Sequence, residues 1–377
     1  MRIACISASQ VPSNTANSIQ MMKACHGLAS LGHEVHLFVP GNQSFTWEEL
    51  ARHYGLRTSF EINGLPVQPR LKRYDFAWKA VREARRLQVD LLYTWVLQSA
   101  WLGTRQDIPV LLEVHDRPTG KLGRRMFGWF LHSNSPKRVL SITQTLANFL
   151  ERDYQYHFLP GELVIGANGV DLEQYENLPD PVQARRLLRL PSQVTAGYTG
   201  HFYAGRGMEV LVQLAQRNPE TNFLWVGGRP EDVLRWQERL KSLGVGNVLL
   251  TGFVDQEHLP LYQAAADILL MPYERSIAGS SGGNSVDICS PMKMFDYMAA
   301  GRAIITSDLP VIREVLNEQN ALFCVPEAID SWDGALKKLL QSPEIRSDLA
   351  RQARQNIKQF TWSARASRAL DGILTQG

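Results

Sequence analysis

The sequence of 377 residues has few cysteines and no pattern that would use them as ligands. Cys5, Cys25, Cys289 and Cys324 are scattered, without a C-x-x-C pair or a histidine at ligand spacing. Such a set predicts neither a disulfide framework nor a zinc site. It fits a reducing compartment, and we therefore expect a cytoplasmic protein.

Long apolar runs are also missing. No stretch reaches the roughly 18 consecutive apolar residues that a membrane-spanning helix needs. The short apolar run after Arg2 is soon broken by polar residues and Pro12, so it does not predict a signal peptide. We expect a protein that is soluble or bound peripherally to a membrane.

The net charge of +3 is too small to indicate general nucleic-acid binding. The positive excess lies in the first half, where residues 1–175 hold 19 Lys and Arg against 15 Asp and Glu. It concentrates in 68–86 and 121–138. The second stretch suggests peripheral contact with an anionic membrane, and a solvated helix face is the alternative. Its cations are Lys121, Arg124, Arg125, Lys137 and Arg138, with Phe127, Trp129 and Phe130 between them.

Short apolar segments alternate with helical patterns along the whole chain, which favours parallel sheets that are buried on both faces. The prolines of 176–193 indicate a linker, and the alternation starts again after them. We therefore predict two α/β domains, 1–175 and 176–359, followed by an amphipathic helix within 360–377. The expected strands are 2–8, 34–39, 90–96, 109–116, 138–143, 195–200, 222–228, 247–253, 267–273, 302–308 and 321–326.

Ligands of open parallel sheets bind outside the carboxyl ends of the strands, and the natural site for two such domains is the cleft between them. The familiar nucleotide motifs are absent, since the chain contains neither G-x-x-x-x-G-K-[ST] nor G-x-G-x-x-G after a strand. P-loop and nicotinamide chemistry therefore lose support.

The stretch SPMKMFDYMAAG predicts a helix that is capped by Ser290, begins at Pro291 and stops at Gly301. Lys293 and Asp296 are three residues apart and share one face of this helix. The helix N-terminus, with Lys293 beside it, suits a phosphate. A local ion pair on a solvated face is the alternative.

Two further loops have compositions that suit either binding of an anion or covering of a bound ligand. In YTGHFYAGRG, Gly200, Gly205 and Gly207 permit close backbone approach, while His201 and Arg206 add positive charge. The long polar run 273–290 is either a mobile flap or a plain insertion.

Two polar residues of the first half follow strands. His115 ends the strand of LLEVHD, where it either contacts a ligand or caps a loop. Asn168 lies in the turn of ANGVD, and its simplest role is that turn.

In this order and spacing, the segments LASLGHEVHLFVP, EVHD, IGANGVDLEQY, YTGHFYAGRG, LLTGF, AAADILLMPY and SPMKMFDYMAAGRAIITSDLP resemble the retaining glycosyltransferases of family 4. The resemblance spans almost the whole chain. It implies the GT-B fold, in which two Rossmann-like domains face each other across a cleft and the last helix crosses back to the first domain.

The resemblance also implies roles in donor binding. The family signature G-R-x-x-x-x-K-G aligns with Gly200 to Gly207, so His201 replaces the arginine, Arg206 replaces the lysine, and both contact the diphosphate. Asp296 takes the second acid of the Glu-x7-Glu motif and binds the ribose, whereas the first acid falls on Ile288. The remaining donor-binding residues are Gly252 and Val254 at the base, with Ser290, Met292, Lys293 and Met294 at the helix N-terminus.

By the same resemblance, His115 touches the transferred sugar and acts with Arg206 and Lys293 in catalysis. Asn168 lines the cleft, and Asn17 and Ser18 lie on the acceptor side, where the usual Gly-Gly turn is missing. Family members react on one face of the anomeric carbon without a protein nucleophile. We expect no metal and no cofactor, which agrees with the lack of an Asp-x-Asp cluster.

The predicted function is transfer of a hexose from a nucleotide-diphosphate sugar, a UDP-sugar by preference, to a saccharide or lipid-linked glycan in polysaccharide biosynthesis. Two alternatives stay open. The missing first acid and His201 would suit a nucleotide-sugar-binding protein without transferase activity, and a nucleotide-sugar 2-epimerase shares the fold.

Overall fold

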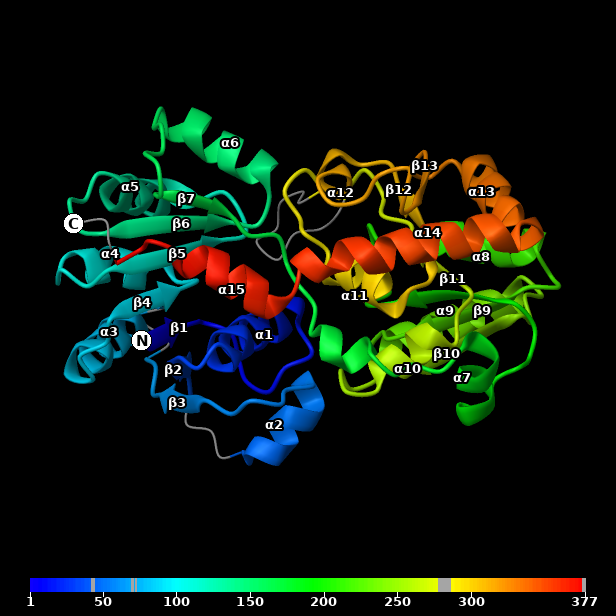
Figure 1. Cartoon of the computed structure of the whole chain (residues 1–377), viewed down its shortest axis with the longest axis horizontal. Coiled ribbons are helices and arrows are strands. Elements are labelled where there is room, and N and C mark those ends of the chain that lie inside the picture. Colours follow the sequence, from blue (N-terminus) through cyan, green and yellow to red (C-terminus); the bar gives the residue numbers. More distant parts are fainter. Residues whose placement is uncertain (42–44, 69–70, 72, 277–285, 375–377) are drawn as a thin grey trace. The chain divides into compact units, whose positions relative to one another are not determined.

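The computed structural model describes residues 1–41, 45–68, 71, 73–276 and 286–374. The chain divides into two compact units, the first made of Met1–Gly169 with Thr361–Gly377 and the second of Val170–Phe360. Each unit contains one parallel sheet with helices on its faces (Figure 1).

The sheet of the first unit has the strand order β3-β2-β1-β4-β5-β6-β7, and every neighbouring pair is parallel. Its strands are β1 (Arg2–Ile6), β2 (Glu34–Pro40), β3 (Glu61–Leu65), β4 (Leu91–Thr94), β5 (Val110–Val114), β6 (Lys137–Ser141) and β7 (Leu163–Ile165). Its helices are α1 (Ala16–Ser30), α2 (Trp47–Tyr54), α3 (Tyr74–Arg86), α4 (Leu97–Thr104), α5 (Gly120–Leu131), α6 (Gln144–Tyr154) and α15 (Trp362–Leu370).

The sheet of the second unit has the order β10-β9-β8-β11-β12-β13, again with parallel neighbours. Its strands are β8 (Thr195–Thr199), β9 (Asn222–Val226), β10 (Val248–Gly252), β11 (Ile268–Met271), β12 (Ala303–Ser307) and β13 (Leu322–Cys324). The helices are η2 (Leu172–Tyr175), α7 (Pro181–Leu187), α8 (Met208–Arg217), α9 (Pro230–Ser242), α10 (Leu259–Ala264), α11 (Met292–Ala300), α12 (Pro310–Arg313), α13 (Ile329–Gln341), α14 (Pro343–Asn356) and η3 (Ile357–Gln359).

All strands expected from the sequence are present, and the prediction of two parallel-sheet α/β domains is confirmed. The inner strands are mostly apolar because helices cover both faces, as in β11, where all four residues are buried. The two strands that the sequence did not reveal, β3 and β7, are the edge strands of the first sheet. They are half-exposed. The sequence of β3, EINGL, lacks the apolar pattern, whereas β7, LVI, is apolar but only three residues long.

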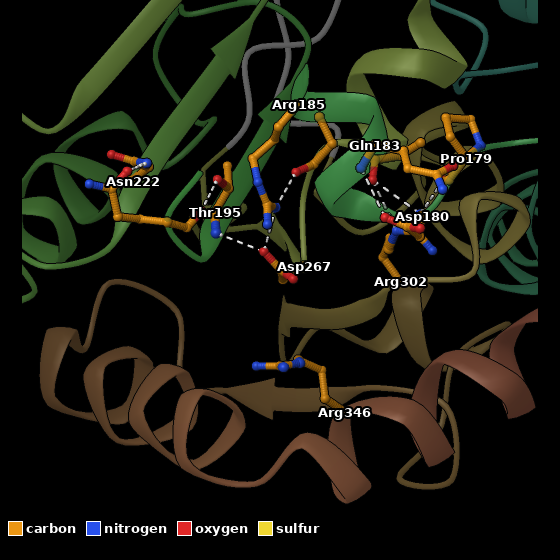
Figure 2. A network of polar contacts seen from close by, with 12 residues as sticks. Pro179, Asp180, Gln183, Arg185, Thr195, Asn222, Asp267, Arg302 and Arg346 are labelled. Atoms are coloured by element: carbon orange, nitrogen blue, oxygen red, sulfur yellow. Dashed lines mark hydrogen bonds and ion pairs between the residues drawn. The ribbon is translucent and has the colours of Figure 1, made fainter. Parts of the chain in front are cut away.

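The prediction of a linker over 176–193 is wrong, because this segment forms α7 and packs within the second unit. Asp180 caps the helix by accepting a hydrogen bond from the Gln183 amide at 2.9 Å, and Pro181 occupies the first turn. The buried Arg185 then donates to Asp267 at 2.8 Å (Figure 2). Pro181 therefore starts a helix here.

The first unit ends six residues earlier than the predicted boundary at 175, and the second begins at Val170. The amide of Val170 donates to the Phe360 carbonyl at 3.0 Å, and the Tyr175 hydroxyl donates to Gln263 at 2.9 Å. These bonds hold the start of the segment in the second unit. The C-terminal helix belongs to the first unit from Thr361 onward.

The order of strands reverses between β8 and β11 in the second unit, and between β1 and β4 in the first. At such a point the connections leave the sheet in opposite directions, so the carboxyl ends of the two strands flank a crevice suited to a ligand. The loops after β8 and β11 are therefore the first place to look for chemistry.

We expect Gly207→Ala to destabilise the second unit by about 3 kcal/mol. Gly207 has a φ of +70°, and a Cβ at this position would lie 1.8 Å from the backbone oxygen of Pro272. Gly244→Ala is the control, because Gly244 has a similar φ of +66° with no atom within 4 Å. Denaturant unfolding that gives equal losses for the two variants would contradict the steric argument.

Candidate functional site

Three glycines bring the carboxyl ends of β8, β9 and β10 into contact. The amide of Gly200 donates to the Val226 carbonyl at 2.8 Å, and the amide of Gly227 donates to the Gly252 carbonyl at 2.8 Å. A Cβ on Gly227 would lie 2.2 Å from the Gly200 oxygen. The predicted residues Gly200 and Gly252 thus lie on one edge of the sheet, joined by Gly227, which the sequence analysis did not select.

Lys293 of α11 reaches this edge through space that Gly200 leaves open. A Cβ on Gly200 would lie 2.7 Å from the Lys293 Nζ atom. The same Nζ lies 3.8 Å from the ring centre of Tyr198 and 5.5 Å from that of Tyr273. Aromatic faces attract a cation without neutralising it.

Arg206 shares the ring of Tyr273 with Lys293. Its guanidinium carbon lies 4.9 Å from the Tyr273 ring centre and 4.8 Å from that of Tyr203. One guanidinium nitrogen also donates to the Tyr203 hydroxyl at 2.6 Å. These two cations, 87 positions apart, therefore come together around one aromatic ring.

The environment of Lys293 disfavours its charge. Burial lowers the pKa of this amine well below its ordinary value, and the Arg206 charge lowers it further, while Asp296 acts in the opposite direction. Within the described part of the chain, no carboxylate forms an ion pair with either cation. An anion bound beside them would relieve their repulsion.

Asp296 lies on the same helix as Lys293 but contacts a different group. The side chain is half-buried and lies against the buried hydroxyl of Tyr175. Burial raises the pKa of Tyr175 well above its ordinary value, and the Asp296 charge adds to this effect. The alternative of a solvated Lys293–Asp296 ion pair therefore finds no support.

The start of α11 differs by one residue from the prediction. The helix begins at Met292 with Pro291 in the N-cap position, so the predicted cap by Ser290 is wrong. It ends at Gly301 as expected, in a left-handed conformation. Ser290 is buried, Met292 is half-buried and Met294 is fully buried.

The loop from Gly205 to Gly207 leaves fewer amides for an anion than the sequence suggested. The amide of Gly207 donates to the Glu274 carboxylate at 3.1 Å, and the Glu274 amide donates to the Gly205 carbonyl at 3.2 Å. His201 stacks on the Tyr203 ring at 5.4 Å. Val254 is half-buried against the apolar cluster that includes Leu224 and Val226.

The candidate residues of the first unit have different surroundings. The Nε2 atom of His115 lies 2.6 Å from a carboxylate oxygen of Glu113. Asn168 is buried and Asn17 is exposed. The buried Ser18 hydroxyl donates to the Gln10 carbonyl at 2.8 Å and lies 2.7 Å from the Tyr54 hydroxyl, so it fixes the loop after β1.

The loop after β1 also borders a cavity of about 550 Å³. Its lining combines apolar side chains with a carboxylate and an imidazole. The lining residues are Gln10, Val11, Pro12, Phe45, Glu49, Leu50 and His53.

The basic stretch 121–138 is only partly a surface. Phe127 and Phe130 are fully buried. Lys137 pairs with Glu162 at 2.9 Å, and the buried Arg138 donates to backbone carbonyls. These four residues therefore do not belong to an exposed basic and aromatic face. The exposed members are Lys121, Leu122, Arg124, Arg125 and Trp129, which we call the α5 face.

The other predictions have the following outcomes. The flap proposed for 273–290 falls largely on 277–285, which lie outside the described residues. Among the described residues, no three His, Cys, Asp or Glu side chains are grouped to hold a metal ion. None of the described helices has the length and apolarity to cross a bilayer.

The tyrosines that surround the two cations were not among the predicted site residues. Tyr198 and Tyr273 are buried within or next to strands, and tyrosines in such segments are typical of core residues. Tyr297 was missed for the same reason, although its hydroxyl accepts a hydrogen bond from the Thr199 amide at 2.8 Å. The one signal in the sequence that could have indicated them is the number of tyrosines near the glycine-rich loop.

Two family profiles match most of the chain. Residues 19–174 match Glycosyltransferase Family 4, and residues 193–342 match Glycosyl transferases group 1. One similar protein is the phosphatidyl-myo-inositol mannosyltransferase of Mycolicibacterium smegmatis, with 26% identity over 89% of this chain and 84% of that protein. Another is the putative teichuronic acid biosynthesis glycosyltransferase TuaH of Bacillus subtilis, with 28% identity over 38% of this chain and 34% of that protein.

Solved structures share the fold. The sucrose-phosphate synthase of Thermosynechococcus elongatus matches with a TM-score of 0.74 and 19% identity over 97% of this chain and 96% of that one. Anabaena Alr3699/HepE, solved in complex with UDP, has a TM-score of 0.74 and 15% identity over the full length of both chains.

Proposed function

The chain belongs to glycosyltransferase family 4, and we propose that it transfers a hexose from a UDP-sugar to a saccharide or lipid-linked glycan with retention of the anomeric configuration. The observation that carries this proposal is the pair of cations at the switch point of the second sheet. Lys293 and Arg206 share one tyrosine ring without forming an ion pair among the described residues. Such a pair suits the diphosphate of a nucleotide sugar.

The reaction needs stabilisation of the charge that develops on the leaving diphosphate, which preorganised donors supply. We propose that Lys293 and Arg206 do this without a metal ion, since two positive charges already lie at the site. His201 contacts the same diphosphate, and Gly252 and Val254 hold the base. We assign no nucleophilic role to Cys289 beside this site, because burial raises the pKa of its thiol to about 11.

The acceptor is proposed to bind on the first unit, near Asn17 and Asn168. The cavity beside the loop after β1 offers the aromatic ring of Phe45 and the carboxylate of Glu49, a combination suited to a sugar ring and its hydroxyls. The similarity to a phosphatidyl-myo-inositol mannosyltransferase supports a lipid-linked acceptor. We place the reaction in the cytoplasm.

Calorimetric titration with UDP, GDP and ADP in EDTA tests the nucleotide site, and a panel of their sugars scored for hydrolysis tests turnover. Heat with UDP and slow release of free hexose are the expected results. Binding without any release would favour a nucleotide-sugar-binding protein, and no heat with any of the three nucleotides would refute the proposal.

Asp296→Asn is expected to weaken UDP binding about tenfold, which corresponds to the loss of one hydrogen bond to a charged acceptor. Tyr175→Phe is the matched control, because it removes the hydroxyl that Asp296 contacts and leaves the carboxylate in place. Equal losses of affinity in calorimetry would mean that Asp296 only holds Tyr175. A loss confined to Asp296→Asn supports contact with the ribose.

We also propose that the α5 face binds an anionic membrane. Leu122 and Trp129 are each about half-exposed beside Arg124 and Arg125, and apolar side chains among cations suit a charged bilayer surface. Reversing the charge at Arg124 and Arg125 should reduce pelleting with anionic vesicles. Reversing the exposed Lys241 and Lys338 of the second unit changes the net charge equally and should leave pelleting intact. Equal behaviour of the two double variants would eliminate the membrane proposal.

A further inference from the structure

A buried carboxylate in the first unit collects hydrogen bonds from four elements. Glu113 of β5 is 3% exposed. Its Oε1 atom accepts from Gln20 of α1, from Arg365 of α15 and lies against His115 Nε2, each at 2.6 Å. Its Oε2 atom accepts from a second Arg365 nitrogen at 3.2 Å and from the Tyr93 hydroxyl of β4. None of these contacts belongs to the nucleotide site.

The charge state of Glu113 determines the tautomer of His115. Burial alone would raise the pKa of Glu113, but the charge of Arg365 and the hydrogen bond from His115 outweigh it and lower this pKa to about 2. At neutral pH the carboxylate is therefore only an acceptor. The Nε2 atom of His115 must carry a proton, and in the neutral imidazole Nδ1 then holds the lone pair.

Arg365 extends the same network to the segment before Asn168. Its Nε atom donates to the carbonyls of Gly166 and Ala167, each at 3.1 Å. Its helix, α15, packs along α1, which begins next to Asn17. One guanidinium thus connects His115, through Glu113, with the segment before Asn168.

We propose that Glu113 and Arg365 are positioning residues, which hold His115 as the Nε2–H tautomer and fix the segment that carries Asn168. The Nδ1 atom then accepts a hydrogen bond from a hydroxyl of the transferred sugar, so the inference rests on the proposed function only for this last contact. His115 keeps 28% of its side chain exposed, which leaves the ring accessible.

The alternative is that Glu113 and Arg365 form a purely structural ion pair. Measurements of stability alone distinguish this alternative poorly from a positioning role. Removing one partner of a buried pair leaves an uncompensated charge, whereas replacing both by neutral groups often restores stability. The informative set is therefore Arg365→Met, Glu113→Gln and the double variant. Arg138→Met is the matched control, because the buried Arg138 donates to the carbonyls of Ala369 and Asp371 at the end of the same helix and does not contact Glu113.

Arg365→Met alone should lower the thermal midpoint by about 6–12 °C. In the double variant most of this loss should be recovered, yet kcat should stay about 100-fold below the wild type, because the tautomer and the segment remain unfixed. Arg138→Met should lower the midpoint and change kcat less than about twofold. Recovery of kcat together with stability in the double variant would overturn the inference.

The ¹⁵N spectrum of histidine-labelled protein gives a readout that does not depend on activity. The His115 signal, assigned by its loss in His115→Gln, should report the Nε2–H tautomer in the wild type and a mixture of tautomers in the double variant. A wild-type signal of the Nδ1–H form would also overturn the inference. A chain that transfers no sugar but shows the expected tautomer would instead refute the proposed function.

Discussion

Replacement of Lys293 by methionine should lower kcat/KM for sugar transfer by about 10²–10³-fold, the cost of removing one preorganised donor at a developing charge. The methionine fills similar space between Tyr198 and Tyr273 and removes only the charge. Arg206 remains, so residual UDP binding is expected. Single-turnover transfer and calorimetry, measured on the same preparation, separate the chemical step from binding.

The same variant should be more stable than the wild type. A lysine whose pKa is lowered in the folded protein destabilises that state whenever it is charged, because the unfolded chain holds the proton more favourably. A gain in thermal midpoint with a loss of turnover marks a group that is retained for function. Lys337→Met, at an exposed lysine paired with Asp333, should change neither property much. A destabilised Lys293→Met variant with near-normal turnover would show that the amine is structural.

The fold was predictable because its inner strands are mostly apolar and alternate with helical patterns. Arg206 and Lys293 were predictable because each follows a strand in a glycine-rich or helix-initiating context, and parallel topology brings such loops to one edge. The contact of Lys293 with tyrosine rings was not predictable, because in the sequence Tyr198 and Tyr273 are typical of core positions.

A misinterpretation and an omission have different physical causes. Pro181 was taken as a helix breaker, although Asp180 before it and Gln183 after it form a helix start. Glu113, an acid within the apolar run VLLEV, was passed over because its partner Arg365 is 252 positions away. Local sequence patterns predict local geometry. A buried charge requires a partner that can lie far away in the chain, and the sequence does not identify that partner.

UDP binding should take up a proton wherever the pH lies between the pKa of Lys293 in the free protein and its pKa in the complex, and there the affinity should fall as the pH rises, by up to tenfold per unit. In the free protein, burial and Arg206 lower the pKa of Lys293, so its amine loses the proton well below pH 10.5. A bound diphosphate raises this pKa again by its negative charge. Between the two values the amine must be reprotonated for binding, and this cost grows with pH. In the same window the stability of the free protein should rise with pH, because the unfolded chain binds more protons than the folded one.

Titration at several pH values from about pH 8 upward, where a phosphate group has lost its second proton, isolates proton uptake by the protein. The heat of binding should differ between HEPES and Tris because the two buffers have different ionisation enthalpies, and the difference gives the number of protons taken up. Lys293→Met should abolish this difference, whereas Arg206→Lys should keep it, since the Lys293 amine is still present. A wild-type enthalpy that is the same in both buffers, with an affinity constant across this pH range, would mean that the amine is already charged in the free protein. The two cations would then need no anion to coexist, and the main support for a diphosphate at this edge of the sheet would be lost.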